Sequence, residues 1–333
     1  MIASTATAEA HRQRPLAIRP PAEGEDGLFS LSWHPICLSG EVARGQVRGF
    51  DFLDGRIVVM RGEDGVAQVL SAFCPHLGAD LAVGNVVGNT LRCAFHRWQY
   101  DCTGKCVKTA SGDPAPPSAR LFRFPTVERF GVVFAFNAEQ PLFDLPAFPF
   151  PEDELLIRAE RYAEQLPVDP WVICCNTPDV QHIRVLHGIK FDSEDPGAEA
   201  EWTDHSMLYD FTGTHAQGER LSFRVGIHGT TLFYQAGRIQ GRWFGFLSPM
   251  KVVRPGRSEL YMIIGVRRDE PDAALFLEQM FELEKRVVAE DLDVLRTIRF
   301  HAGTLTASDR TLARFLAYLK RYPRAHAAGA FIR

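Results

Sequence analysis

Short runs of apolar residues, many alternating with polar ones, fill the chain from about residue 28 to residue 140. Segments 28–33, 56–60 and 131–136 show the pattern, and Gly and Pro separate such runs. Apolar runs of about four to eight residues bounded by turn residues are typical of strands. The pattern therefore predicts an all-β domain over residues 28–140.

A proline-rich segment, residues 141–151, interrupts this pattern with four Pro in eleven residues. Clustered Pro breaks both helices and strands, so we expect a linker between two domains here. Residues 1–27 are rich in Ala, Pro, Glu and Arg. We expect them to form a flexible N-terminal arm.

Residues 152–333 mix two periodicities. Strand-like runs at 207–211, 230–234 and 260–266 precede two helical stretches. These stretches cover about 272–299 and 308–322, and Pro323 stops the second. The chain is therefore expected to be α+β, with an all-β domain followed by a domain in which helices flank an antiparallel β-sheet.

Composition narrows the classes of protein. The hydrophobic share of 46% and the charged share of 23% are typical of a globular protein. A net charge of −4 without a basic, aromatic-rich stripe argues against nucleic-acid binding. No apolar run approaches the roughly 18 residues that cross a membrane, and residues 1–27 lack the apolar core of a secretory signal. We expect a cytoplasmic protein.

Two short motifs suggest a metal cluster. Cys74-Pro-His76 and Cys93-Ala-Phe-His96 each offer one thiolate and one imidazole. Two Cys on one iron and two His on the other form the ligand set of a Rieske [2Fe–2S] centre. A structural zinc site takes the same residue types and remains an alternative. The aromatic frame is less typical of zinc knuckles; it comprises Phe73, Phe95, Trp98 and Tyr100.

The other cysteines show no framework of paired spacings. We expect them to be free thiols or small core residues, with a disulfide between Cys102 and Cys106 as the less favoured alternative. The remaining three are Cys37, Cys174 and Cys175.

A second constellation runs from Asn176 to Gly188. Asn176 or Thr177 is expected to cap a helix that Gly188 ends. On that helix Asp179 and His182 share a face, being three residues apart. His182 and His187 are five residues apart, about 140° around an ideal helix. They can bind one metal only if the helix is distorted or ends between them.

Together, these motifs resemble the oxygenase (α) subunit of Rieske non-haem iron oxygenases, over most of the chain beyond the arm. The resemblance implies a [2Fe–2S] cluster on Cys74, His76, Cys93 and His96. It also implies a mononuclear Fe(II) on His182 and His187 in the domain at 152–333, with open positions for O₂. Asp179 would carry electrons between the centres, across the subunit boundary of a homotrimer.

A third iron ligand is expected from a late helix, because the family supplies an Asp there, often after Glu. Asp291 follows Glu290 and falls near the middle of a predicted apolar stripe. Glu284 lies in the same arc, two turns earlier, and is the alternative. The stripe consists of Phe276, Met280, Leu283, Val287, Val294 and Ile298, widened by Leu277, Phe281, Val288, Leu292 and Leu295.

Two positions depart from the family pattern. Arg97 stands where Gly usually follows the second cluster His, and Leu77 stands where Arg is frequent. Neither residue would bind iron. Both flank exposed cluster ligands, so docking of the electron donor or the cluster potential could differ.

The resemblance implies an oxidoreductase that uses O₂ to hydroxylate or oxidatively dealkylate a small to medium, hydrophobic organic substrate. A ring dihydroxylase, a Rieske ferredoxin and a zinc-stabilised interaction protein are the alternatives. No dinucleotide-binding Gly motif is present, so a ferredoxin or an NAD(P)H-dependent reductase is expected to supply electrons. Seven aromatic residues could line an apolar pocket or could instead form only the core of the sheet: Phe211, Phe223, Phe233, Tyr234, Trp243, Phe244 and Phe246.

Overall fold

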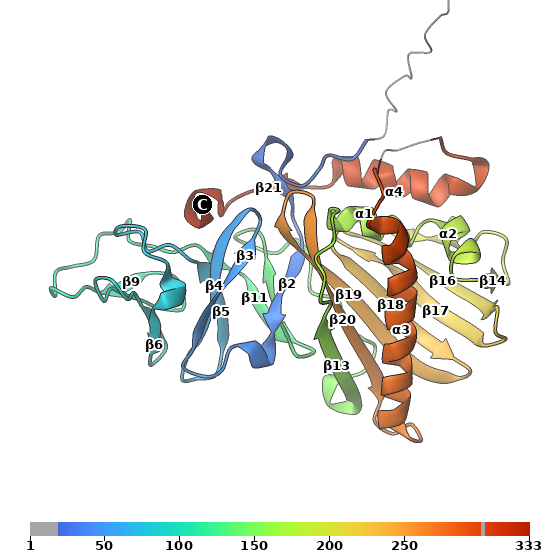
Figure 1. Cartoon of the computed structure of the whole chain (residues 1–333), viewed down its shortest axis with the longest axis horizontal. Coiled ribbons are helices and arrows are strands. Elements are labelled where there is room, and N and C mark those ends of the chain that lie inside the picture. The colour runs from blue at the N-terminus through green and yellow to red at the C-terminus, as the bar shows by residue number, and fades with distance from the viewer. Residues whose placement is uncertain (1–18, 301–303) are drawn as a thin grey trace, which may run out of the picture.

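The computed structural model describes residues 19–300 and 304–333 (Figure 1). Residues 1–18 of the predicted arm lie outside the described residues. The rest of that arm contacts the protein: the Glu23 N–H donates to Asp169 Oδ2 at 3.0 Å, and the Glu23 carboxylate accepts from the Ser30 N–H at 2.9 Å.

Three antiparallel sheets form the first half of the chain. One sheet has the order β11-β12-β2, formed by Thr126–Arg129, Val132–Phe136 and Trp33–Leu38. The second has the order β10-β5-β4-β3, formed by Arg123–Phe124, Ala67–Ser71, Gly55–Arg61 and Val47–Phe52. The third has the order β6-β7-β8-β9, formed by Asn85–Val87, Thr90–Arg92, Gln99–Tyr100 and Cys106–Lys108. The short 3₁₀ helices here are η1 (Glu25–Gly27), η2 (Ser39–Glu41) and η3 (Leu81–Val83).

One large antiparallel sheet dominates the second half, with the order β13-β20-β19-β18-β17-β16-β14 and β15 paired to β16. Its strands are Leu155–Arg161 (β13), Ile189–Phe191 (β14), Glu201–Trp202 (β15), Ser206–His215 (β16), Arg220–His228 (β17), Leu232–Ile239 (β18), Arg242–Arg254 (β19) and Arg257–Arg267 (β20). The helices are α1 (Pro170–Cys174), α2 (Val180–Val185), α3 (Ala273–Leu295), α4 (Arg310–Arg321) and α5 (Gly329–Ile332), with the 3₁₀ helices η4 (Glu152–Glu154), η5 (Pro196–Glu199) and η6 (Ala307–Asp309). The α+β expectation is confirmed.

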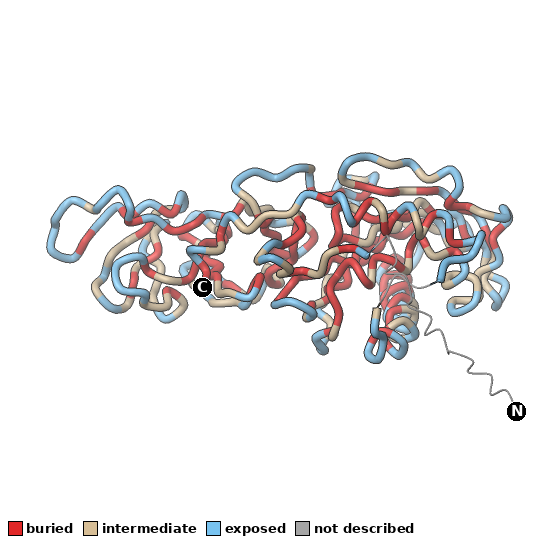
Figure 2. Tube along the Cα trace, turned by 90° about the horizontal axis from the view of Figure 1, so that it is seen from above, coloured by how far each residue is buried: buried red, intermediate tan, exposed pale blue. Residues whose placement is uncertain are grey.

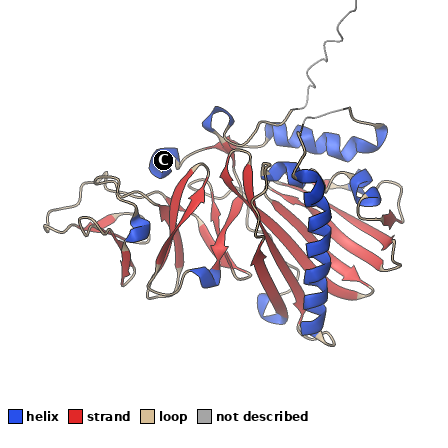
Figure 3. Cartoon of the chain, viewed as in Figure 1, coloured by secondary structure: helices blue, strands red, loops and turns tan. Residues whose placement is uncertain are grey.

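The long helix α3 lies across one face of the large sheet (Figures 1 and 3). The helix buries an apolar face that includes Phe276, Phe281 and Leu292. Two members of the predicted stripe are wrong, because Val294 is 52% exposed and Ile298 lies beyond the end of the helix. The buried face therefore follows the residues at 277, 281, 284, 288, 292 and 295, which recur at helical spacing.

The opposite face of the sheet packs on the first half of the chain. Trp243 and Tyr261 from the large sheet share a core cluster with Trp33 and Phe134 from β2 and β12. Phe148, from the predicted linker, packs in the same cluster. The large sheet is thus held between the β11-β12-β2 sheet and α3.

The C-terminal segment returns to the first half. β21 (Arg324–Ala325) pairs with β1 (Phe29–Ser30), and Ile332 is fully buried in the core around β4 and β5. The burial map in Figure 2 shows a continuous buried interior along the long axis. No helix in the described ranges is long and apolar enough to cross a membrane.

Candidate metal centre

Two loops carry the first group of candidate ligands: one lies between β5 and η3, and the other lies within the small sheet β6-β7-β8-β9. The loop from Cys74 is closed by backbone hydrogen bonds from the Cys74 N–H to Ala79 O at 2.9 Å and from the Gly78 N–H to Cys74 O at 2.8 Å. The loop from Cys93 joins β7 to β8, and the Cys93 N–H donates to Trp98 O at 2.8 Å. Short-range backbone hydrogen bonds therefore close both loops.

The four candidate side chains form two separate pairs. Cys74 and Cys93 are buried, whereas His76 is exposed and its Nδ1 lies 3.2 Å from His96 Nδ1. No three of these four ligand atoms lie within 4.8 Å of one another. One tetrahedral zinc, with bonds of about 2.0–2.3 Å, would bring all four within roughly 4 Å. The geometry argues against the zinc alternative and fits a two-iron cluster.

The surroundings suit a bound cluster. Burial raises the pKa of the Cys74 thiol, and Tyr100 Oη lies 3.0 Å from its sulfur. A buried thiol pair of this kind is costly to ionise unless a metal holds the thiolates. The His76 ring stacks on Trp98 with centroids 4.4 Å apart, which fixes the ring at the surface.

The residue after the second cluster histidine has an unusual backbone. Arg97 has φ +58°, in the left-handed region that favours glycine. This explains why a Gly is usual at this position in the family pattern. Leu77, the other departure, is 67% exposed beside the cluster loop, and Phe95 is 63% exposed.

Helix α2 carries the second group. The predicted caps Asn176 and Thr177 are wrong: α2 begins at Val180, and Asp179 caps it by accepting the His182 N–H at 2.9 Å. Pro178 directly precedes this cap, and a residue before proline avoids the helical conformation, which places the helix start after it.

The helix also ends between the two histidines, as the metal hypothesis requires. His187 lies beyond Val185, and Gly188 follows it with φ +63°. The turn brings His187 Nε2 to 3.1 Å from His182 Nε2. The separation of about 140° expected on a straight helix is thereby removed.

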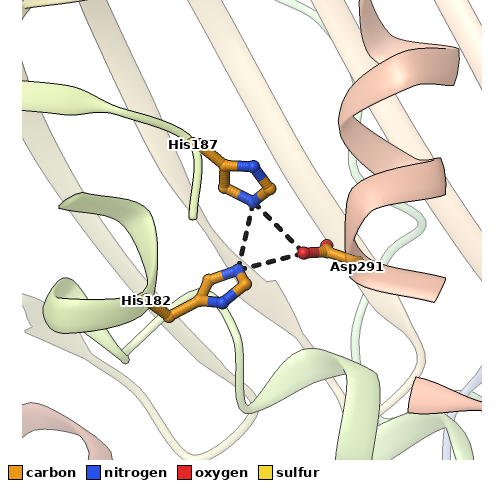
Figure 4. Close-up of side chains that lie close together, drawn as sticks. All are labelled: His182, His187 and Asp291. Atoms are coloured by element: carbon orange, nitrogen blue, oxygen red, sulfur yellow. Dashed lines mark hydrogen bonds and ion pairs between the residues drawn. The ribbon is translucent and has the colours of Figure 1, made fainter. Parts of the chain in front are cut away.

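Asp291 on α3 completes the group. Its Oδ1 lies 3.1 Å from His182 Nε2 and 3.2 Å from His187 Nε2. Figure 4 shows the three side chains pointing toward one another, two from the α2 region and one from α3. Hereafter we call them the triad; their three ligand atoms form the one such group found among the described residues.

The triad fits a metal better than it fits mutual hydrogen bonds. Asp291 Oδ1 is buried and has no aligned hydrogen-bond partner. Three ligands at about 2.1 Å and right angles around one ion lie about 3 Å apart, which matches the observed spacing. Burial alone would raise the pKa of Asp291, but the two imidazoles outweigh it and hold the pKa at about 2. Two histidines and one carboxylate form the facial set typical of non-haem Fe(II).

A neighbouring carboxylate orients His187. Glu290 Oε2 lies 3.0 Å from His187 Nδ1, so that nitrogen donates and Nε2 is left free for the metal side. Burial acts to lower the pKa of His187, but Asp291 and Glu290 together raise it. The sequence pattern assigned no role to Glu290, although its position beside Asp291 was a signal for one.

Glu284, the alternative third ligand, does not join the triad. Its carboxyl is buried and accepts a hydrogen bond from Gln235 Nε2 at 3.0 Å. Burial raises its pKa to about 7. Sequence reasoning missed Gln235 entirely.

A cavity of about 1110 Å³ adjoins the triad between the large sheet and α3. Five of the seven predicted aromatics line it: Phe211, Phe223, Phe233, Phe244 and Phe246. Tyr234 and Trp243 do not line it, because side chains alternate along a strand and these two face the opposite core. The cavity is therefore apolar over most of its sheet wall.

All seven cysteines are free. The expectation of thiols is confirmed, and Cys102 and Cys106 form no disulfide.

Comparisons with known proteins agree with this geometry. A model of the Rieske [2Fe-2S] domain matches residues 32–125. The cholesterol 7-desaturase nvd of Bombyx mori is 31% identical over 186 residues, which cover 54% of this chain and 39% of that protein. A probable 3-ketosteroid-9-alpha-monooxygenase oxygenase component of Rhodococcus rhodochrous is 37% identical over 112 residues, 34% of this chain and 28% of that protein.

The chain contains a Rieske domain and, over the matched segments, is homologous to oxygenase components of this kind. The matched segments span less than half the length of these two relatives. The similarity in fold covers more of the chain than the similarity in sequence. NdmA of Pseudomonas putida CBB5 with caffeine superposes with a TM-score of 0.67 at 20% identity, covering 86% of this chain and 89% of that one. Dicamba monooxygenase bound to dicamba gives 0.67 at 17% identity, covering 87% and 97%.

A Rieske homologue is expected to hold a [2Fe–2S] cluster, and the paired loops fit it. The triad fits a mononuclear iron. The four loop side chains would hold the cluster, and His182, His187 and Asp291 would hold the iron.

Proposed function

We propose that this protein is the oxygenase component of a Rieske system that hydroxylates, or oxidatively dealkylates, a mainly apolar organic substrate. The observation that carries the proposal is the triad beside an apolar cavity of about 1110 Å³, in a chain that also contains a Rieske domain. A Rieske ferredoxin would need neither feature. In the hydroxylation, substrate, O₂, two electrons and two protons give the hydroxylated product and water.

The chain's own residues perform distinct tasks in this proposal. The triad would supply three ligands to an iron next to the cavity. Glu290 holds the His187 ring in the tautomer whose Nε2 is free. The aromatic wall excludes water and binds apolar substrate surface. When bound, the iron supplies O₂ activation and the cluster supplies electrons one at a time.

The names of similar proteins support the substrate class. They mention cholesterol, a ketosteroid, caffeine and dicamba, all ring compounds. A cavity of about 1110 Å³ is slightly larger than the usual range for ligand pockets, about 300–1,000 Å³. We therefore propose a ring compound of medium size.

Assembly into a homotrimer is part of the proposal. Figure 1 places the sheet β6-β9 and α2 at opposite ends of the chain, and the two ends are also far apart along the long axis in Figure 2. An electron would therefore pass more readily from the cluster of one subunit to the triad of the next. Apolar side chains are exposed at both ends: Phe95 and Leu77 near the cluster, and Val185, 83% exposed, on α2.

Asp179 is proposed to connect the two centres across such a boundary, with His96 as the partner. Its Oδ1 is used by the helix cap, and among the described residues Oδ2 has no hydrogen-bond partner. A carboxylate with one free oxygen can accept a hydrogen bond from a histidine of another subunit.

Asp179→Asn tests this role, because Asn caps helices as well as Asp does. We expect both metals to be retained, the cluster to be reducible and substrate oxidation to be nearly lost. Unchanged turnover would reduce Asp179 to a helix cap. Sedimentation that shows only monomer under turnover conditions would refute the trimer.

The overall proposal is tested on purified protein with a ferredoxin and an NAD(P)H-dependent reductase as surrogate donors. Iron and acid-labile sulfide should be present, the reduced protein should show a Rieske EPR signal, and a panel of ring compounds should include one that gives an oxygenated or dealkylated product. Stoichiometric zinc without iron or sulfide would overturn the proposal.

A further inference from the structure

A buried carboxyl group in the cavity wall has no part in the triad. Glu284 lies on α3 seven residues before Asp291, so both face the same side about two turns apart. Only 6% of Glu284 is exposed, and it lines the same cavity as the triad. At a rise of about 1.5 Å per residue, the two positions are about 10 Å apart along the helix.

Gln235 supplies the sole hydrogen bond to this carboxyl among the described residues. Gln235 projects from β18 and its Nε2 donates to Glu284 Oε1 at 3.0 Å. Two neighbours of Gln235 line the same apolar wall: Phe233, two residues before it on β18, and Phe246, its pairing partner on β19. The second oxygen, Oε2, has no partner in the described part of the chain. A buried carboxyl with an unused oxygen costs free energy that a ligand hydrogen bond would recover.

We propose that Gln235 and Glu284 bind a hydroxyl group at one end of an elongated, otherwise apolar substrate, whose reacting carbon then lies at the triad. The proposal deepens the proposed function and rests on it. We call Gln235 and Glu284 the polar pair.

The surroundings favour a hydroxyl over a charged group. No cationic side chain among the described residues is hydrogen-bonded or ion-paired to Glu284. Burial raises its pKa, because the ionised carboxylate is poorly solvated in this wall. A hydroxyl can donate to the ionised form and accept from the neutral form, which a carboxylate or an ammonium ligand cannot do.

The spacing defines the shape of the ligand. The polar pair and the triad are about 10 Å apart along α3, and the side chains span part of that distance. A molecule that contacts both must therefore extend along α3 over the remainder. A fused-ring alcohol with the hydroxyl at one end has this form.

The test is a binding measurement on the iron-loaded protein, independent of turnover. Each alcohol is compared with compounds of the same carbon skeleton. The alcohol 5α-androstan-3β-ol is compared with the hydrocarbon 5α-androstane and with the corresponding 3β-amine, and 2-decalol is compared with decalin. Dissociation constants would be obtained from quenching of tryptophan fluorescence. We expect at least one alcohol to bind about 10- to 100-fold more tightly than its hydrocarbon, the size of one hydrogen bond to a charged group.

Glu284→Leu should remove most of this preference, lower alcohol affinity about 10-fold or more, and leave hydrocarbon affinity unchanged or higher. Gln235→Leu should have a smaller effect in the same direction, and Glu284→Gln should restore part of the preference. Glu278→Leu, at an exposed position on the same helix that does not line the cavity, is the matched control and should keep the full preference.

Equal binding of alcohol and hydrocarbon, tightest binding of the amine, or failure of every alcohol to bind would overturn the polar pair. Iron content is measured on each sample. Loss of iron binding in the wild type would instead contradict the proposed function, so the two failures can be told apart.

Discussion

The two metal-binding regions are built in opposite ways. The cluster loops take all four candidate ligands from residues 74–96, and the histidines lie at the surface. The triad combines His182 and His187 with Asp291, more than a hundred residues away in sequence, inside a cavity wall. Its side chains are only 11–18% exposed.

This contrast matches what each site would do. A group that receives electrons from another protein must lie close to the surface. A site that oxidises a substrate with O₂ benefits from an enclosure that excludes water and other reductants. The local loop provides exposure, and the contact between two distant elements provides enclosure.

The largest expected effect comes from breaking the triad while sparing the cluster. His187→Ala should abolish iron binding at the triad and all product formation, because two ligands cannot hold the ion well. The visible spectrum of the cluster should be unchanged. Product formation and metal content check this, and His215→Ala, whose ring pairs with Glu219, should retain iron. Full activity of His187→Ala would refute the triad.

The reciprocal change breaks the cluster and spares the triad. Cys93→Ser should bleach the visible spectrum and destabilise the first half, because Cys93 is buried at 1% exposure. Iron at the triad should remain, detectable by ferrous nitrosyl EPR. A spectrum that survives this substitution would contradict the cluster assignment. Cys102→Ser, at an exposed free thiol, is the control and should leave the spectrum unchanged.

A smaller effect is expected from the residue that orients a triad ligand. Glu290→Ala removes the acceptor 3.0 Å from His187 Nδ1 and should weaken iron binding about 10-fold, the lower end for such partners. Glu290→Gln should recover part of the affinity, because its amide oxygen still accepts. Competition with a chelator measures the change. Asp293→Asn, on the solvent side of α3, should have no effect; equal effects at both positions would exclude a specific role for Glu290.

The smallest expected effect concerns the backbone at the cluster. Arg97→Gly should stabilise the first half by up to about 1 kcal/mol, because Gly adopts φ +58° without the steric cost that Arg bears. Thermal unfolding of the cluster-loaded protein measures it. The same exchange at Arg48, in the strand β3, should destabilise instead. A loss of stability in Arg97→Gly would show that its side chain contributes more than its backbone costs.

The sequence by itself determined the elements and the local motif. Alternating and helical periodicities predicted β4, β12, β20, α3 and α4, since burial of one face imposes the period on the chain. Cys74, His76, Cys93 and His96 could be paired in advance because two short loops hold them. The α+β class follows from the same patterns.

Tertiary structure alone decided the rest. Helical periodicity admits Asp291 and Glu284 equally, and only the resemblance favoured Asp291; in the structure the choice depends on which turn of α3 lies opposite α2. Likewise, strand register decided that Phe233 and Gln235 face the cavity while Tyr234 faces the other core. Periodicity specifies which residues share a face; the packing of distant elements determines what that face contacts.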